Sequence, residues 1–433
     1  MTSQSVSAPA RAKAGAGAWT ALIILCFVYI LNFIDRQLLS ILAKPIQDTL
    51  HVSDSQLGRI GGLYFALFYC FIAIPVGWVA DRTNRSRVLA FACALWSAAT
   101  MACGLARTYP ELVGARMAVG VGEAGGVPPS YAIITDSFPP GQRGTALGFY
   151  NLGPPIGQAL GIAFGASIAA AYSWRHAFIA IGIVGIATAL IVFIFVREPK
   201  KGALDVVVET VAPKAGFWPT TKMFFSTPAL LLMALAGGAA QFVTYGSINF
   251  TTLFLMREKG MTLQEVAVWY AIVTGVCMSA GIFFAGWLSD VFGKRSKRAF
   301  GIIPAVGLLC AAPLYAGFVH APTWRIALTF LAGPLFFNYF YLSPAVAFVQ
   351  QEVRPEQRVL SGALLLLVMN GIGLGLGPTF VGAASDYLKA YSPHHSLQLA
   401  LYALLPFYIL SIVLFLWLAA VLQRGPKTQG VSA

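Results

Sequence analysis

Twelve long apolar segments constrain this 433-residue chain more than any other feature of its sequence. A helix needs about 20 predominantly apolar residues to cross the roughly 30 Å of hydrocarbon in a bilayer. We expect such spans at residues 19–42, 57–80, 88–106, 110–135, 143–170, 174–196, 228–256, 264–289, 299–319, 323–349, 359–388 and 397–422. Because 58% of the residues are hydrophobic and only 10% are charged, the composition also indicates a polytopic membrane protein.

Two short patterns occur twice, once in each half of the chain. Residues 77–81 read Gly-Trp-Val-Ala-Asp after the second apolar segment, and residues 286–290 read Gly-Trp-Leu-Ser-Asp after the eighth. Basic residues follow both copies. A second pair of loops ends in Gln-Arg, at Arg143 after the fourth segment and at Arg358 after the tenth. Matched repeats of this kind are typical of membrane proteins built from two homologous halves.

These repeats predict how the chain is divided. We assign residues 18–197 to an N-terminal six-helix bundle and residues 227–423 to a C-terminal one. Residues 198–226 are expected to form a cytoplasmic linker between them. Residues 1–17, rich in alanine, serine and glycine, are expected to be a disordered cytoplasmic tail, and residues 424–433 a second tail. The predicted fold class is an all-α membrane protein with twelve transmembrane helices in two pseudo-symmetric bundles.

The distribution of basic residues predicts the orientation in the membrane. Of the 29 lysines and arginines, 8 fall in the loops of one side and Arg36 and Arg116 fall within spans, which leaves 19 on the side of both termini. An excess of basic residues marks the cytoplasmic side. We therefore expect a multi-pass protein of the bacterial inner membrane with both termini cytoplasmic. The net charge of +13 then serves contact with lipid headgroups and not nucleic acid.

Four ionisable residues lie deep within apolar segments: Asp35 and Arg36 in the first, Arg116 and Glu123 in the fourth. A charge at bilayer depth costs at least about 2.5–3.5 kcal/mol, so it is kept only where it is paired, hydrated or used. The seven residues from Arg116 to Glu123 make almost two helical turns, which places both on one face. We expect the first and fourth helices to lie side by side, with all four groups in one watery pocket.

Asp35 and Glu123 are the predicted proton-coupling residues. Burial favours a neutral carboxyl group and a nearby arginine favours the carboxylate, so movement of the arginine would switch proton affinity. Arg36 and Arg116 are predicted to hold an anionic headgroup, because a guanidinium offers phosphate or carboxylate a bidentate fork. The alternative is that the four residues only form static salt bridges, although buried ion pairs stabilise proteins poorly. Which carboxylate is the main proton site stays open at this stage.

A cytoplasmic gate is predicted from the charged residues of the repeated loops. An aspartate at a helix end can cap a neighbouring helix and pair with basic residues, forming a lock that breaks when this side opens. The alternative is that the basic residues serve topology alone, but aspartates contribute little to orientation. The predicted gate residues are Asp81, Arg82, Arg85, Arg143, Asp290, Lys294, Arg295 and Arg358.

The second half carries no ionisable residue deep in its helices and is rich in aromatic residues there. We therefore predict that the N-terminal half holds a polar head and the proton site, while the C-terminal half lines an apolar wall for a tail. The alternative is that these aromatic residues face lipid or pack in the core. The predicted wall residues are Phe242, Tyr245, Phe337 and Tyr341.

Other functional classes lack support in the sequence. All six cysteines fall inside apolar segments, as packing residues do, and no histidine has the companions of a metal site. There is no phosphate-binding loop for ATP and no nucleophile–base arrangement for an enzyme. We expect no cofactor and no metal, and a monomer whose partners are the bilayer, protons and a small molecule.

Several motifs resemble those of the major facilitator superfamily. They are the doubled Gly-x-x-x-Asp loop with its basic residues, the fourth-helix pattern from Leu112 through Arg116 to Gly120, and the fifth-helix pattern Gly153-Pro-Pro-Ile-Gly157. The first loop departs from the family pattern by having Asn84 where glycine is usual. Within the superfamily, residues 32–36 (Asn-Phe-Ile-Asp-Arg) and 120–124 (Gly-Val-Gly-Glu-Ala) are similar to the spinster-type branch.

The resemblance implies two six-helix bundles around a central cavity, with substrate near the membrane midplane and alternating access by rocking. The spinster-type branch contains lysolipid and sphingolipid transporters, so the implied function is proton-coupled transport of an amphipathic lipid of that kind. A transporter of small organic anions or drugs on the same scaffold is the alternative. A receptor that binds without transporting is a more distant one.

Overall fold

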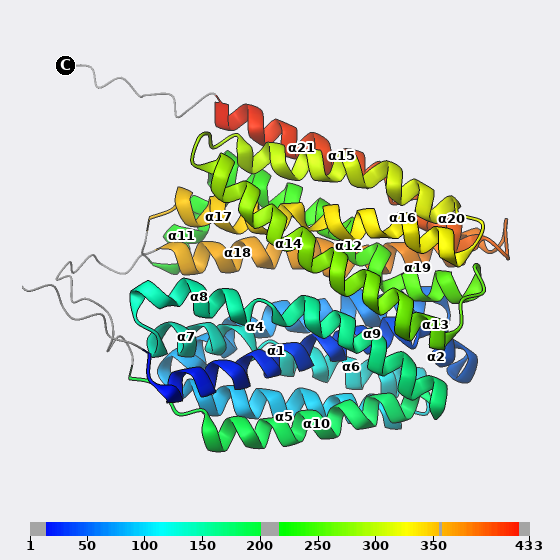
Figure 1. Cartoon of the computed structure of the whole chain (residues 1–433), viewed down its shortest axis with the longest axis horizontal. Coiled ribbons are helices and arrows are strands. Elements are labelled where there is room, and N and C mark those ends of the chain that lie inside the picture. Colours follow the sequence, from blue (N-terminus) through cyan, green and yellow to red (C-terminus); the bar gives the residue numbers. More distant parts are fainter. Residues whose placement is uncertain (1–13, 201–215, 355–356, 424–433) are drawn as a thin grey trace, which may run out of the picture.

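The computed structural model describes residues 14–200, 216–354 and 357–423, and over these residues it consists of helices and connecting turns, without strands. Two bundles lie side by side with their helices running along the same direction (Figure 1). Helices α1 to α10 form the first bundle and α11 to α21 the second, so the predicted fold class is confirmed. Residues 1–13 and 424–433 of the predicted tails, and residues 201–215 of the predicted linker, lie outside the described residues.

The described part of the first bundle contains ten α-helices and one π-helical turn, η1. Their bounds are α1 Ala16–Ile41, α2 Ala43–Leu50, α3 Asp54–Arg59, η1 Ile60–Tyr64, α4 Phe65–Arg82, α5 Arg85–Leu105, α6 Tyr109–Glu123, α7 Val127–Ser137, α8 Pro140–Tyr150, α9 Gly153–Ala171 and α10 Trp174–Phe195.

The second bundle repeats this plan after a short surface helix. Its bounds are α11 Phe217–Ser226, α12 Pro228–Arg257, α13 Leu263–Glu265, η2 Val266–Tyr270, α14 Ala271–Gly293, α15 Ala299–His320, α16 Trp324–Phe337, η3 Asn338–Tyr341, α17 Leu342–Glu352, α18 Arg358–Asn370, η5 Gly371–Leu376, α19 Gly377–Leu388, α20 Ser396–Tyr402 and α21 Leu405–Gln423. Helix α1 begins and α21 ends at the same end of the molecule (Figure 1), which we call the terminal end. The other end, near α2, α13 and α20, is the opposite end.

Eleven helical stretches of the described chain are long and apolar enough to cross a membrane. The remaining predicted span, residues 110–135, is built from α6 and α7, which meet at a break over residues 124–126. Two glycines and then Pro128 and Pro129 follow α6, and a proline ring removes a backbone donor and clashes with the carbonyl four residues earlier. The predicted span is thus present, but as two helices joined by a turn and not as one. Glu123 is the last residue of α6, so it lies at a helix end inside the bundle.

The glycines of α9 pack against α1, as their four-residue spacing leads one to expect. A Cβ atom added at Gly157 would lie 2.5 Å from the carbonyl oxygen of Ile30, and one at Gly161 would lie 3.1 Å from the Cα of Ile34. These distances leave no room for a side chain. The close packing fixes α1, which carries Asp35 and Arg36, against the rest of its bundle.

Gly157→Val is therefore expected to lower the free energy of unfolding by about 1–3 kcal/mol, because it forces extra volume into a packed contact. Gly148→Val is the matched control, since a Cβ atom at Gly148 meets nothing within 4 Å. Thermal unfolding of the purified protein in detergent measures both. Equal melting temperatures for the two variants would show that the α1–α9 contact is looser than described.

Candidate functional site

The structure brings Asp35, Arg36, Arg116 and Glu123 together as two ion pairs. Arg36 Nε lies 2.6 Å from Glu123 Oε2, and Arg116 Nη1 lies 3.4 Å from Asp35 Oδ1. Each pair therefore joins α1 to α6. We call these four residues the central charge cluster.

The cluster is held by side chains and not by direct packing of its two helices. Helix α1 packs chiefly against α9 and α10, whereas α6 packs chiefly against α5 and α4. Two glycines of α6 make the latter contacts close: an added Cβ would lie 2.9 Å from the Phe65 carbonyl oxygen at Gly120 and 2.6 Å from the Trp96 backbone nitrogen at Gly122. The sequence Gly-Val-Gly-Glu thus lets α6 approach α4 and α5, and Glu123 reaches Arg36 across the remaining space.

Asp35 has a partner for each carboxylate oxygen. Oδ1 faces Arg116, and Oδ2 lies 2.7 Å from the hydroxyl of Thr100 on α5. The same hydroxyl lies 2.8 Å from the carbonyl oxygen of Trp96. Since a hydroxyl has one proton to donate, Thr100 donates to the Asp35 carboxylate, or to Trp96 when a protonated Asp35 donates to it. Both protonation states of Asp35 can be accommodated without moving a helix.

The carboxylate of Glu123 is less fully hydrogen-bonded than that of Asp35. Its Oε2 accepts a hydrogen bond from Arg36, but its Oε1 is buried without a hydrogen-bond partner among the described residues. A buried carboxylate is far more costly than a buried neutral carboxyl group, and most costly where one oxygen has no donor. Of the two acids, Glu123 is therefore the one whose charge is less well satisfied.

Aromatic rings enclose the guanidinium of Arg36. Its Cζ lies 5.0 Å from the ring centroid of Phe33, 5.3 Å from that of Phe65 and 4.7 Å from that of Tyr69. Cation–π attraction at these distances holds the charge in place, and more strongly where water is excluded. The arrangement leaves Arg36 able to keep its position if Glu123 becomes neutral.

The cluster is buried, which differs from the watery pocket predicted above. The side chains of Asp35 and Arg116 are each 2% exposed and that of Glu123 is 0% exposed. Arg36 is the most accessible of the four, at 13%. Neighbouring rings and the glycine contacts of α6 account for this, so any ligand or proton would reach the cluster through the Arg36 side.

The predicted aromatic wall is divided in the structure. Tyr245 is half-buried and lies on α12, which contacts α1 of the first bundle. Phe242 is instead packed in the second bundle, with its ring centroid 4.5 Å from that of Phe407. Phe337 likewise lies 5.4 Å from Phe340 of its own bundle, and Tyr341 is buried there. Of the two predicted wall residues on α12, Tyr245 is therefore the one whose side chain is not fully buried.

Arg85, one of the predicted gate residues, forms its ion pairs inside the first bundle. Its guanidinium lies 2.6 Å from Asp136 Oδ2 and 2.6 Å from Glu198 Oε1. Asn84, the departure from the family pattern, accepts a hydrogen bond of 2.8 Å from the Arg87 backbone and so caps α5. These contacts tie the first bundle's own loops together, and the gate role of these residues stays a prediction.

The other gate residues are placed as follows. Arg82 stacks 4.1 Å from the ring centroid of Trp78, and Arg143 Nε donates to the Phe138 carbonyl oxygen at 3.0 Å. The side chain of Asp81 lies outside what the structure describes. The remaining four are exposed: Asp290, Lys294, Arg295 and Arg358.

Sequence reasoning missed a second charged cluster, at the opposite end. It joins the bundles and centres on Asp54, at the start of α3, and Arg257, at the end of α12. A sequence signal for Asp54 exists in the capping box formed by Ser53 and Gln56, which marks a helix start. No local signal links it to Arg257.

The sequence of this chain is similar to those of known membrane proteins. The family model described as Major Facilitator Superfamily matches residues 25–378. An MFS-type efflux pump from Mycolicibacterium smegmatis is 31% identical over 410 residues, which are 94% of this chain and 94% of the pump. Protein spinster homolog 1 from Xenopus tropicalis is 26% identical over 400 residues, which are 88% of this chain and 75% of that protein.

A solved structure is similar throughout. It is the crystal structure of a bacterial homolog to the human lysosomal transporter spinster, in an inward-facing and unoccupied conformation. The TM-score is 0.87 at 28% sequence identity, and the match covers 94% of this chain and 98% of that one. The similarity therefore extends over both bundles.

Proposed function

The chain belongs to the major facilitator superfamily, in its spinster-like branch, and we propose that it couples proton movement to the transport of a lysolipid- or sphingolipid-like substrate. As a member of that family it is a multi-pass membrane transporter. The proposal concerns the driving ion, the substrate class and the residues that connect them.

The observation that carries the proposal is the Arg36–Glu123 pair. Glu123 lies at the break between α6 and α7 with no partner for Oε1 in the described part of the chain, and Arg36 lies at the accessible side of the cluster. A proton on Glu123 removes the charge that neutralises Arg36. The guanidinium, still held by its three rings, is then available to an anionic headgroup.

Charge balance determines whether proton binding favours or opposes headgroup binding. The two acids and two arginines of the central charge cluster sum to zero, so a proton on Glu123 leaves a net charge of +1. One singly charged anionic headgroup restores neutrality. Proton binding and headgroup binding therefore favour each other, and this coupling is reciprocal by thermodynamic linkage. Asp35 stays ionised in this scheme, because Arg116 and Thr100 satisfy both of its oxygens.

An amphipathic substrate suits the division between the bundles. The ionisable residues deep in the spans belong to the first bundle, and α12 of the second, which carries Tyr245, contacts α1. We propose that the headgroup binds at Arg36 and that the acyl chain extends over the second bundle. We also propose that the terminal end is cytoplasmic, from the excess of basic residues on that side, and that the transporter works as a monomer in a bacterial inner membrane.

Reconstituted transport of a substrate panel tests the substrate class. Uptake into proteoliposomes is compared for a lysophospholipid, a short-chain analogue with the same headgroup, and a simple organic anion, each with and without a pH gradient. We expect the lysophospholipid to be taken up fastest and to respond to the gradient. Equal uptake of the long- and short-chain molecules would contradict the proposed acyl-chain site.

The efflux pump relative favours a second candidate, export of a small drug-like molecule on the same scaffold. A dye or drug that outcompetes the lysophospholipid in the same assay would support this candidate. The proton-coupling scheme would survive that outcome, because it rests on Glu123 and Arg36 and not on the acyl chain.

A further inference from the structure

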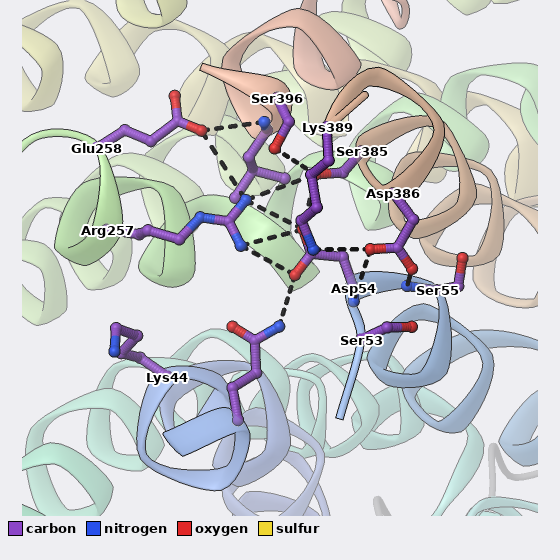
Figure 2. A network of polar contacts seen from close by, with 12 residues as sticks. Lys44, Ser53, Asp54, Ser55, Arg257, Glu258, Ser385, Asp386, Lys389 and Ser396 are labelled. Carbon is purple, nitrogen blue, oxygen red and sulfur yellow. Dashed lines mark hydrogen bonds and ion pairs between the residues drawn. The ribbon is translucent and has the colours of Figure 1, made fainter. Parts of the chain in front are cut away.

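A second network of charges lies at the opposite end, where the two bundles meet (Figure 2). We define the Asp54 cluster as Asp54 of the first bundle together with four residues of the second: Arg257, Ser385, Asp386 and Lys389. The side chain of Asp54 is 0% exposed, and it lies between the bundles with the other members around it (Figure 2).

Three side chains of the second bundle bind the Asp54 carboxylate. Arg257 is bidentate, with Nη1 2.9 Å from Oδ1 and Nη2 3.0 Å from Oδ2. The Ser385 hydroxyl donates to Oδ2 at 2.6 Å, and Lys389 Nζ lies 3.2 Å from the same oxygen. From its own bundle Asp54 receives one hydrogen bond, from Gln47 Nε2 at 2.5 Å. The carboxylate is thus bound mainly by the other half of the molecule.

Asp386 makes the reverse connection. Its carboxylate accepts hydrogen bonds from the backbone nitrogens of Asp54, at 3.2 Å, and Ser55, at 2.7 Å. The first turn of a helix leaves such donors without partners in the helix itself. Helix α3 of the first bundle is therefore capped by an acid of the second, and Lys389 Nζ holds that acid at 2.7 Å.

The backbones of the two bundles are also in direct contact next to the Asp54 cluster, where α3 and η1 meet η5 and α19. A Cβ atom added at Gly62 of η1 would lie 2.7 Å from the carbonyl oxygen of Gly375 in η5, and one at Gly58 would be 3.1 Å from the carbonyl carbon of Pro378. The backbone nitrogen of Leu63 donates to the Thr379 hydroxyl at 3.3 Å. Polar and steric contacts thus close the same seam.

The pseudo-symmetric seam, between α9 and the segment η2–α14, differs. An added Cβ at Gly275 would lie 2.9 Å from the Ala159 Cβ, so the packing is similarly close. Helix α9 contains no ionisable residue, however, and Glu265 of α13, which contacts α9, caps its own helix through Thr262. Charge interactions that cross between the bundles at this end are therefore concentrated on one side.

We propose that the Asp54 cluster is the latch that keeps the opposite end closed and that must separate before this end can open. The proposal rests on the proposed transport by alternating access. Such a latch is both firm and reversible: removing one partner leaves an unpaired buried charge, whereas opening hydrates all partners at once and recovers the desolvation free energy.

The test measures conformation in the full-length chain without substrate or pH gradient. Spin labels are attached at Asp48→Cys and Tyr391→Cys, whose native side chains are 60% and 72% exposed on opposite bundles at this end. The chain without these two substitutions still has its six native cysteines, so it measures the background labelling. We expect Asp54→Asn to increase the ratio of long to short label distances about tenfold or more, as loss of hydrogen bonds to a charged group implies.

Glu258→Gln is the matched control. Glu258 is also a buried acid beside Arg257, at 3.8 Å, but it caps α20 of its own bundle through the backbone nitrogen of Leu397. We expect this variant to keep the short distance. If Asp54→Asn fails to fold, Asp386→Asn keeps Asp54 but removes the charge that caps α3 and pairs with Lys389, and it should shift the distances in the same direction.

Unchanged distances in both Asp54→Asn and Asp386→Asn, or an equal shift in Glu258→Gln, would overturn the latch. Because this test measures distances between labels, its outcome is independent of the flux assays that test the proposed function. A wider opposite end in Asp54→Asn supports the latch even if Glu123 proves not to carry protons. Proton-coupled flux with unchanged distances would refute the latch and leave the function standing.

Discussion

Glu123→Gln is expected to abolish substrate flux driven by a pH gradient while leaving the protein folded. Glutamine keeps the shape of the neutral side chain but can neither bind nor release a proton. Proteoliposome uptake with and without an imposed gradient measures the effect. We expect the gradient-dependent part to fall at least about tenfold, since a charge-assisted hydrogen bond of the kind made to Arg36 contributes about 1.5–3 kcal/mol.

Asp35→Asn is the matched comparison, because it changes the other acid of the same cluster in the same way. The Asp35 carboxylate has Arg116 and Thr100 as partners, so we expect it to hold Arg116 in place without exchanging protons during transport. Flux through this variant should be lower but should still respond to the gradient. Proton dependence lost in Asp35→Asn and intact in Glu123→Gln would reverse the two assignments.

Arg116→Met is expected to lower the free energy of unfolding by about 3–5 kcal/mol, because it leaves the Asp35 carboxylate buried without its ion-pair partner. Denaturant or thermal unfolding in detergent micelles measures the loss. Arg82→Met is the control for removing an arginine, since Arg82 is exposed and contacts the face of Trp78. That variant should change stability by less than about 1 kcal/mol.

The double variant Asp35→Asn with Arg116→Met separates the ion pair from packing. Replacing both charges removes the unpaired carboxylate, so much of the lost stability should return. Losses that simply add in the double variant would show that the two residues do not interact in the folded protein.

The central charge cluster could be anticipated from the sequence because two local facts pointed to it. Charged residues are rare at bilayer depth, and the seven-residue spacing of Arg116 and Glu123 sets a common helix face. What could not be anticipated is how the helices pack around it. The pairing of Arg36 with Glu123 depends on Gly120 and Gly122 meeting α4 and α5, and hydropathy contains no information on such contacts.

The break after Glu123 was visible in the sequence as Gly-Gly-Val-Pro-Pro, yet the apolar run continues through it and outweighed that signal. The consequence is functional. A continuous helix would place Glu123 in mid-helix, whereas the break places its carboxylate at the C-terminal end of α6, where the helix dipole favours a nearby cation such as Arg36.

The Asp54 cluster could not be predicted because its partners are distant in the chain. Asp54 and Arg257 are separated by 203 residues, and Asp54 and Ser385 by 331. Each looks in isolation like a polar or charged residue at the end of a span. Their meeting depends on how the two bundles dock, which pattern and spacing within one bundle do not determine.

Proton uptake on substrate binding would show whether Glu123 takes up a proton as the headgroup reaches Arg36. Titration calorimetry of the detergent-solubilised protein, repeated in buffers of different ionisation enthalpy, gives the number of protons taken up as the lysophospholipid binds. We expect about one proton for the wild-type protein and for Asp35→Asn, and none for Glu123→Gln, because one proton balances one anionic headgroup at Arg36. Undiminished proton uptake by a Glu123→Gln protein that still binds the lipid would contradict the account.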